Sequence, residues 1–102
     1  MNNCISFKPS IDNESKILIL GSMPGVKSLE EQQYYAHPKN RFWKVMGTIC
    51  NEPKLHEYSY KLKLKTLLKN NIALWDTIKS CKREGSLDSD IQNEKPNDIR
   101  KL

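Results

Sequence analysis

Residues 16–25, Lys-Ile-Leu-Ile-Leu-Gly-Ser-Met-Pro-Gly, decide the fold of this chain. The apolar run is continuous rather than alternating, which is typical of a strand buried on both faces in a parallel sheet. The glycine turn that follows stands at the carboxyl end of that strand, where open α/β sheets bind ligands. Its spacing fits neither a dinucleotide fingerprint nor a P-loop, and an ordinary turn is the alternative. We predict a ligand-binding edge made by Gly21, Ser22, Met23, Pro24 and Gly25.

Two helices are predicted directly after this turn. Residues 28–31, Ser-Leu-Glu-Glu, have the spacing of a capping box, which predicts the start of a helical turn. Asn40 is a good N-cap for the next helix. The apolar face of that helix is predicted to carry Phe42, Val45, Met46 and Ile49, at positions i, i+3, i+4 and i+7.

Residues 58–69 fit two patterns. Lys61 to Lys65 alternate like a strand, whereas the spacing of the apolar residues suits a helix, namely Tyr60, Leu64, Leu67 and Leu68. We favour the helix, because two asparagines follow it as a stop and a second apolar run, Ile-Ala-Leu-Trp at 72–75, begins at once. The resulting order of strand, helix, helix and strand is an α/β crossover pattern.

The C-terminal part is predicted to be a polar loop over residues 79–90, with Gly85 as its turn, and then a helix that begins at Asn97. The chain ends within one turn of that start, and one turn is not stable alone. A length of 102 residues allows one small domain, 1–102, with a thin core. From these local signals we expect a domain that is cut short.

Composition narrows the class of protein. No apolar run approaches the roughly 20 residues that cross a membrane, and no signal peptide is visible at the N-terminus. Three scattered cysteines indicate reduced thiols and a cytoplasmic location rather than a disulfide framework. The net charge is +5, and residues 41–83 hold ten Lys or Arg against three acids. That balance is compatible with a partner that carries phosphates, but on charge alone we favour a solvated lysine-rich helix face.

Aromatic and amide side chains gather between residues 34 and 43. The amide of Asn40 could orient a water or read a base edge, and it could do so while its oxygen caps a helix. Phe42 and Trp43 offer faces on which a base could stack, but the helix core is the better prediction for Trp43. Tyr34 and Tyr35 could line a pocket or pack inside the domain.

Five further residues are candidates for polar contacts. Asp76 follows the second strand at its carboxyl end and could contact a ligand or cap a loop. His37 could donate to a phosphate or line a turn. The residues that could reach phosphates from the next loop, or face water, are Lys82, Arg83 and Ser86.

Metal and thiol chemistry are not predicted. His37, His56 and the cysteines show no close pairing at ligand spacing. Lys82 and Arg83 could lower the pKa of Cys81, but no partner base is evident for a catalytic thiol.

These residues resemble the uracil-DNA glycosylase superfamily, and within it the hypoxanthine (deoxyinosine) DNA glycosylase branch. The resemblance runs from Ile17 to about Ile91. It rests on Gly-Ser-Met-Pro-Gly at 21–25, on Tyr-Tyr-Ala-His-Pro-Lys-Asn-Arg-Phe-Trp at 34–43, and on Ala-Leu-Trp-Asp at 73–76 with the segment 81–88. It implies a three-layer α/β/α sandwich with a short parallel sheet. It also implies base excision repair of double-stranded DNA, in which a flipped deaminated base, hypoxanthine or uracil, is cut from its sugar by water without metal or cofactor.

The resemblance also implies roles for single residues. Other branches handle the water with an Asp or Asn inside the first motif, where this chain has Ser22 and Met23. That role passes to Asn40, while Phe42 corresponds to the aromatic on which the base stacks and Asp76 to the residue that reads the base edge. The base-binding set is Gly21, Ser22, Met23, Phe42 and Asp76. The DNA-binding set is Pro24, Gly25, His37, Lys82, Arg83 and Ser86.

The chain departs from the family at its C-terminus. The family continues with further helices, two more strands and a Ser-Pro loop that contacts DNA, so we expect a partial sandwich with an exposed sheet edge. A homo-oligomer could cover that edge. Two alternatives therefore stand beside glycosylase activity: an inactive remnant with residual DNA affinity, and a nucleotide-binding or self-associating module without catalysis.

Overall fold

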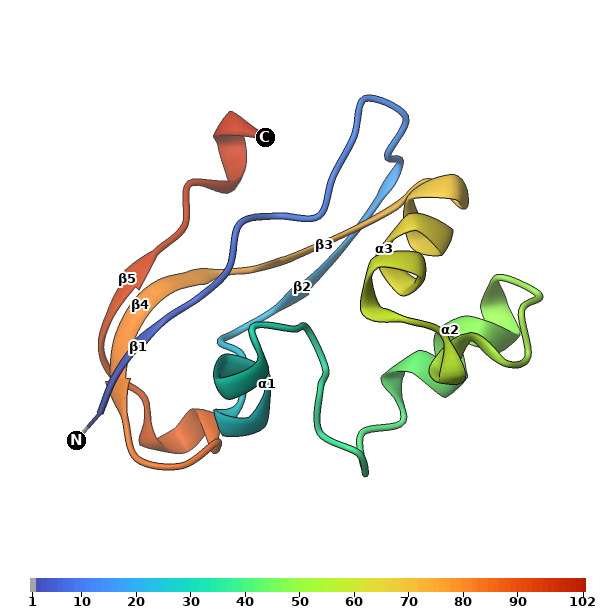
Figure 1. The fold of residues 1–102 in the computed structure, drawn as a ribbon. Helices are drawn as coiled ribbons and strands as arrows, with labels where there is room; N and C mark the ends of the chain where they lie inside the picture. Colours follow the sequence, from blue (N-terminus) through green and yellow to red (C-terminus); the bar gives the residue numbers. More distant parts are fainter. Residues whose placement is uncertain (1) are drawn as a thin grey trace.

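A computed structural model describes residues 2–102 of the chain (Figure 1). Five strands, three α-helices and three 3-10 helices follow one another in those residues. In chain order they are β1 Asn2–Ile5, β2 Ile17–Gly21, α1 Val26–Glu31, α2 Phe42–Ile49, η1 Leu55–Glu57, α3 Tyr60–Lys69, β3 Ile72–Asp76, β4 Ile78–Arg83, η2 Asp88–Asp90, β5 Gln92–Pro96 and η3 Ile99–Lys101.

The strands β2 and β3 form the predicted parallel pair, with α1, α2 and α3 in the crossover between them. Their register places Gly21 beside Asp76 at the carboxyl edge. On its other side β3 meets Ser10, whose backbone exchanges two 2.9 Å hydrogen bonds with Leu74. The α/β class and the short parallel sheet are confirmed. The prediction that β2 is buried on both faces was wrong, because β2 lies at the edge of the pair. The buried strand is β3, which lies between β2 and the segment at Ser10.

The C-terminal part differs from the prediction. The predicted loop 79–90 begins with β4, which pairs with β1 and β5 in a three-stranded antiparallel sheet. Every residue of β5 is exposed, so its sequence shows no alternation of apolar and polar residues. The strand forms because it pairs with β4. The predicted helix at Asn97 is absent from the described residues, and its place is taken by η3. The Asn97 amide instead donates to the backbone oxygen of Asp76 (2.8 Å).

The first helix also begins differently. α1 follows Gly25, and Ser28 is buried within the helix, where its hydroxyl accepts a hydrogen bond from the Ala36 backbone N–H (3.0 Å). The capping-box prediction at 28–31 was therefore wrong, because the Ser28 hydroxyl serves the loop after the helix. The predicted helix over 58–69 is confirmed as α3, and Ser59 caps it by accepting from the Leu62 N–H.

The predicted helix over residues 42–49 is confirmed as α2, but its buried face is different. Val45 and Ile49 are 52% and 64% exposed, while Trp43 and Met46 are buried. Trp43 sets this rotation, since its indole N–H donates to the Tyr34 backbone oxygen inside the core (3.3 Å). The core prediction for Trp43 is confirmed.

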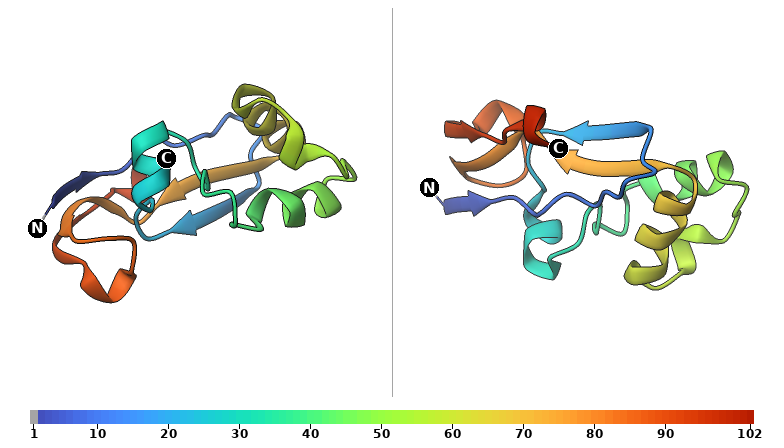
Figure 2. Two further views of the ribbon diagram at one scale, coloured as in Figure 1. Left: turned by 60° about the horizontal axis from the view of Figure 1, so that its bottom comes forward. Right: turned by 90° about the horizontal axis from the view of Figure 1, so that it is seen from above.

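Two apolar clusters hold these elements together. The larger joins α2, η1, α3 and β3 through Tyr34, Trp43, Met46, Cys50, Leu55, Leu67, Ile72 and Leu74. The smaller lies behind the glycine turn and comprises Cys4, Met23 and Cys81. In Figure 2 the parallel pair runs between the antiparallel sheet at one end of the molecule and α2 and α3 at the other. No helix within residues 2–102 has both the length and the apolarity to span a bilayer.

Candidate functional site

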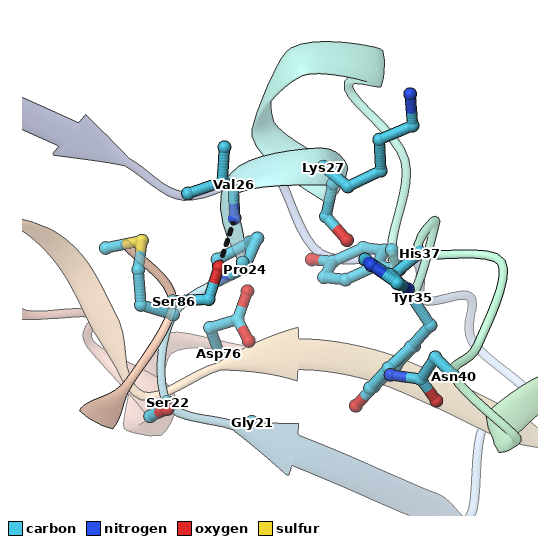
Figure 3. Close-up of a pocket in the computed structure, with 14 residues that line it drawn as sticks. Gly21, Ser22, Pro24, Val26, Lys27, Tyr35, His37, Asn40, Asp76 and Ser86 are labelled. Carbon is cyan, nitrogen blue, oxygen red and sulfur yellow. Dashed lines mark hydrogen bonds between the residues drawn. The ribbon is translucent and has the colours of Figure 1, made fainter. Parts of the chain in front are cut away.

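A cavity of about 350 Å³ opens at the carboxyl edge of β2 and β3 (Figure 3). It collects segments that are far apart in the sequence: the glycine turn, the start of α1, the loop before α2, the end of β3 and the loop after β4. Its lining residues are Gly21, Ser22, Met23, Pro24, Gly25, Val26, Lys27, Ser28, Tyr34, Tyr35, His37, Asn40, Asp76 and Ser86. Nine of the predicted site residues therefore meet in one pocket: the five of the turn, with His37, Asn40, Asp76 and Ser86.

Asp76 forms the polar floor of this pocket. Its side chain rises from β3 between Pro24 and Ser86 on one side and Tyr35 and Asn40 on the other (Figure 3). The residue is 4% exposed. Burial, and then the nearby Asp88 carboxylate, raise the pKa of Asp76 from 3.8 to about 6.

Gly21 makes room for that carboxyl group. A Cβ atom at position 21 would lie 2.6 Å from Asp76 Oδ1, which is closer than any normal contact. The paired register of β2 and β3 fixes this approach. Glycine is thus required here by the neighbouring strand, and it leaves one oxygen of Asp76 against the bare backbone at the pocket floor.

Tyr34 and Tyr35 both line the pocket, and Tyr35 is the one whose ring is stacked on a second ring. Phe42 does not line the cavity; its ring is stacked on that of Tyr35, with centroids 3.7 Å apart and planes 13° apart. Behind it Phe42 meets Trp43 edge to face. Phe42 thus lies one ring away from the cavity, behind Tyr35, and its predicted role in stacking a base stays a prediction. The sequence could not rank these two rings, because both stand in one aromatic block.

Asn40 presents its amide donors to the pocket. Its Oδ1 accepts from the Phe42 backbone N–H (2.9 Å), which fixes the side chain at the start of α2. The amide nitrogen makes no hydrogen bond within residues 2–102. The Oδ1 bond lies one residue before the N-cap position, which Arg41 occupies without a side-chain cap bond, so the N-cap prediction for Asn40 was off by one residue. The role of its free amide nitrogen toward a water or a base stays a prediction.

One hydrogen bond each fixes how His37 and Ser86 face the pocket. The Nδ1 atom of His37 accepts from the Lys39 backbone N–H (3.1 Å), so the neutral ring carries its proton on Nε2, where it can donate. The Ser86 hydroxyl accepts from the Val26 N–H (2.8 Å) and closes the β4–η2 loop onto α1.

Arg83 cannot make the predicted phosphate contact, and this prediction was wrong. The residue is 1% exposed, and its guanidinium donates to the Pro24 backbone oxygen under the glycine turn. Arg83 follows buried Cys81 by two residues on β4, so its side chain lies on the same inward face of the strand. Lys82 is exposed on β4 and stands outside the pocket, so its contact with DNA stays a prediction. Burial outweighs the neighbouring cation at Cys81, so the pKa of that thiol is raised rather than lowered.

Two residues of the site were missed by sequence reasoning. Asp88 accepts a 2.7 Å hydrogen bond from the Ser22 hydroxyl and so ties η2 to the glycine turn. Lys27 lines the pocket and pairs with Glu31 one helical turn later (3.1 Å). The contact between Asp88 and Ser22 has no local signal in the sequence. The pair of Lys27 and Glu31 has one, which is its i,i+4 spacing. No cluster of three potential metal ligands occurs in the part of the chain that the structure describes.

Comparison with known proteins adds three findings. A family model described as the uracil DNA glycosylase superfamily matches residues 9–101. A hypoxanthine DNA glycosylase from Methanosarcina barkeri is 46% identical over 91 residues, 89% of this chain and 57% of that protein. A protein of the same description from Methanosarcina acetivorans is 46% identical over 96 residues, 94% of this chain and 60% of that protein.

A solved structure agrees with this match. It is a solution NMR structure from Methanosarcina acetivorans, described as that of a candidate uracil DNA glycosylase. It is similar to this chain with a TM-score of 0.85 and 43% identity, over 96% of this chain and 60% of the other. The chain thus spans 57–60% of the length of the curated relatives it matches.

Proposed function

This chain belongs to the uracil DNA glycosylase superfamily, and from that premise we propose that its pocket receives a deaminated base flipped out of DNA, hypoxanthine before uracil. In this proposal water then cleaves the bond between the base and its sugar. The observation that carries the proposal is the convergence of Asn40, Tyr35 and Asp76 on one cavity behind a glycine turn. The volume, about 350 Å³, lies at the small end of the usual range for ligand pockets.

Each lining group supplies one part of base binding. The ring of Tyr35 offers a stacking face that Phe42 holds in place from behind. The backbone of the turn at Gly21 can approach the base closely because no Cβ intervenes there. Asp76 lies in the floor, where it would meet the polar edge of the base. Stacking and polar contacts of this kind offset the few kcal/mol that flipping costs.

Asn40 is assigned to the water. An amide cannot deprotonate water, but glycosidic cleavage passes through an oxocarbenium-like state for which a correctly placed water suffices. The water oxygen forms its bond to C1′ as the bond from C1′ to the base nitrogen breaks. The electron pair leaves with the base, which takes up a proton, and an abasic sugar remains.

The DNA strand is proposed to pass over the rim of the pocket. His37 can donate from Nε2 to a phosphate, and the backbone at Pro24 and Gly25 and the Ser86 hydroxyl stand beside it on the same cavity. Lys82 is the exposed cation that would extend this surface along β4. Such contacts position DNA without reading its sequence.

The test is base release from a duplex with one deoxyinosine, run beside a duplex with one uracil, at excess protein. We expect free hypoxanthine from the wild type and a loss of at least tenfold in rate for Asn40→Ala, with duplex binding retained. Asn13→Ala is the matched control, since Asn13 is exposed and outside the pocket.

Two outcomes would contradict the proposal. If a folded protein bound the deoxyinosine duplex but released no base, the pocket would serve for binding alone. If it bound free nucleotides tightly and duplex without dependence on salt, a small-nucleotide module would replace the glycosylase assignment.

A further inference from the structure

We infer that Asp76 binds the base as a neutral carboxylic acid, and that its partner is a base edge where an N–H stands next to a carbonyl oxygen. This inference rests on the proposed function and deepens it. It assigns the protonation state of one group and the chemical class of edge that this group recognises. Hypoxanthine and uracil both carry such an edge.

The geometry around the carboxyl group favours the neutral form. Its Oδ2 atom is buried without a hydrogen-bond partner within residues 2–102. No cation of the described chain is paired with it: Lys27 holds Glu31, and buried Arg83 donates to Pro24. A buried carboxylate that receives neither a donor nor a cation is strongly disfavoured relative to its protonated form.

Of the groups that face Asp76 from neighbouring elements, the Asp88 carboxylate acts in the same direction. Asp88, from η2, adds a negative charge nearby, and the hydroxyls of Tyr34 and Tyr35, from the loop before α2, are groups whose own ionisation Asp76 disfavours. The other ionisable pocket residues are His37 and Lys27. In the open pocket the pKa of Asp76 is about 6, and a bound base would displace water and raise it further.

The donor and the acceptor of a neutral Asp76 match a base edge that has one acceptor next to one donor. A carboxylic acid has one O–H donor and one acceptor oxygen, whereas a carboxylate only accepts. The donor can meet O6 of hypoxanthine while the other oxygen accepts from N1–H; O4 and N3–H of uracil offer the same pair. An ionised Asp76 would instead face the carbonyl oxygen with negative charge. The O–H would also stabilise the charge that gathers on that oxygen as the base leaves.

The experiment measures hypoxanthine binding to the full chain by calorimetry between pH 5 and 8, in buffers of different ionisation enthalpy. We expect proton uptake on binding, and an affinity that falls about tenfold per pH unit above the pKa of the free protein. Asp76→Asn, which has a donor and an acceptor at all pH values, should keep the affinity and lose the pH dependence. Asp76→Ala should bind weakly throughout.

Asp88→Asn provides a second, independent variant. It removes a negative charge near Asp76 while its amide oxygen can still accept from Ser22, so the pH midpoint should move down. An affinity that rises with pH, a loss of binding in Asp76→Asn, or an unmoved midpoint in Asp88→Asn would each overturn the inference. Because free-base binding needs no bond cleavage, absence of base release would count against the proposed function alone.

Discussion

Tyr35 and Phe42 differ by seven positions in the chain, yet they act as one stacked unit in which only Tyr35 meets the cavity. Tyr35 adopts a positive φ of 55°, an uncommon conformation for a residue with a side chain. This backbone conformation places the Tyr35 ring on Phe42. The amino-acid sequence around Tyr35 does not predict it. The sequence could therefore predict that this block reaches the pocket, but not which of the two rings lines the cavity.

The stacked pair predicts how substitutions of Tyr35 affect DNA binding. Tyr35→Leu should weaken binding of a deoxyinosine duplex by about ten- to a hundredfold, since stacking of one base on an aromatic ring is worth about 1–3 kcal/mol. Tyr35→Phe keeps the stacking face and should bind within about threefold of the wild type. Fluorescence anisotropy on a labelled duplex measures both. Equal losses in the two variants would show that the hydroxyl, and not the ring face, matters.

Because the pKa of Asp76 is raised in the folded protein, we expect the free energy of unfolding to depend on pH. Its folded-state pKa, about 6, lies above the ordinary value of 3.8, so the folded protein holds the proton more tightly than the unfolded chain. Its contribution to stability is therefore greatest below about pH 4, falls as the pH rises to about 6, and is level beyond. Since one pKa unit is about 1.4 kcal/mol, the loss is about 3 kcal/mol.

Asp76→Asn isolates this effect from the other acids. Urea unfolding at about pH 4 should give nearly equal free energies for the variant and the wild type. At about pH 7 the variant should be the more stable by about the same 3 kcal/mol. A variant that is less stable than the wild type at neutral pH would show that the ionised carboxylate has a stabilising partner.

The periodicity of apolar residues correctly predicted the helix α2 but not which of its faces is buried. Phe42, Val45, Met46 and Ile49 have ideal spacing, but the indole bond from Trp43 to the Tyr34 backbone turns the helix so that Trp43 and Met46 face inward. The buried strand β3 and the capped helix α3 could be predicted because their signals are local. The exposed strand β5 could not, since only pairing with β4 defines it.

The corrected face of α2 can be checked by a pair of substitutions. Met46→Ala should cost about 2–5 kcal/mol in the free energy of unfolding, because it opens a cavity in the main cluster. Val45→Ala, one position earlier and half exposed, should change stability by less than about 0.5 kcal/mol. Chemical denaturation of the two variants decides between the faces, and the reverse order of losses would restore the periodicity-based face.

At the scale of the whole molecule, two sheets are joined across the glycine turn. Arg83 of β4 reaches the Pro24 carbonyl, Met23 packs on Cys4 and Cys81, and Asn97 bonds to Asp76. Most of these contacts link positions far apart in the chain and have no local signature. The family resemblance supplied nine of the residues that line the pocket, whereas the buried state of Arg83 depends on how the sheets meet. Self-association that covers the edge of β2 stays a proposal.

The net charge of the chain predicts how DNA binding depends on salt. With +5 overall, duplex binding should weaken with salt by about 0.9 decade per decade for each phosphate contacted. Anisotropy titrations at several salt concentrations, with plain and deoxyinosine duplexes, give this slope. Similar slopes for the two duplexes would place the ionic contacts on the backbone, and the offset between them would measure recognition of the base. A flat response would argue against DNA as the partner.

The stacked rings beside the cavity have an optical consequence. Tyr35 stands at the pocket, Phe42 behind it, and Trp43 edge-on to both, so a tyrosine donor and a tryptophan acceptor share one rigid array. Light absorbed by the tyrosine passes to the indole by resonance energy transfer. We expect a purine stacked on the tyrosine face to quench the excited tyrosine by contact and so to reduce this transfer. Occupancy of the pocket should therefore be visible as quenched tryptophan emission on tyrosine excitation, in the unlabelled protein and in real time.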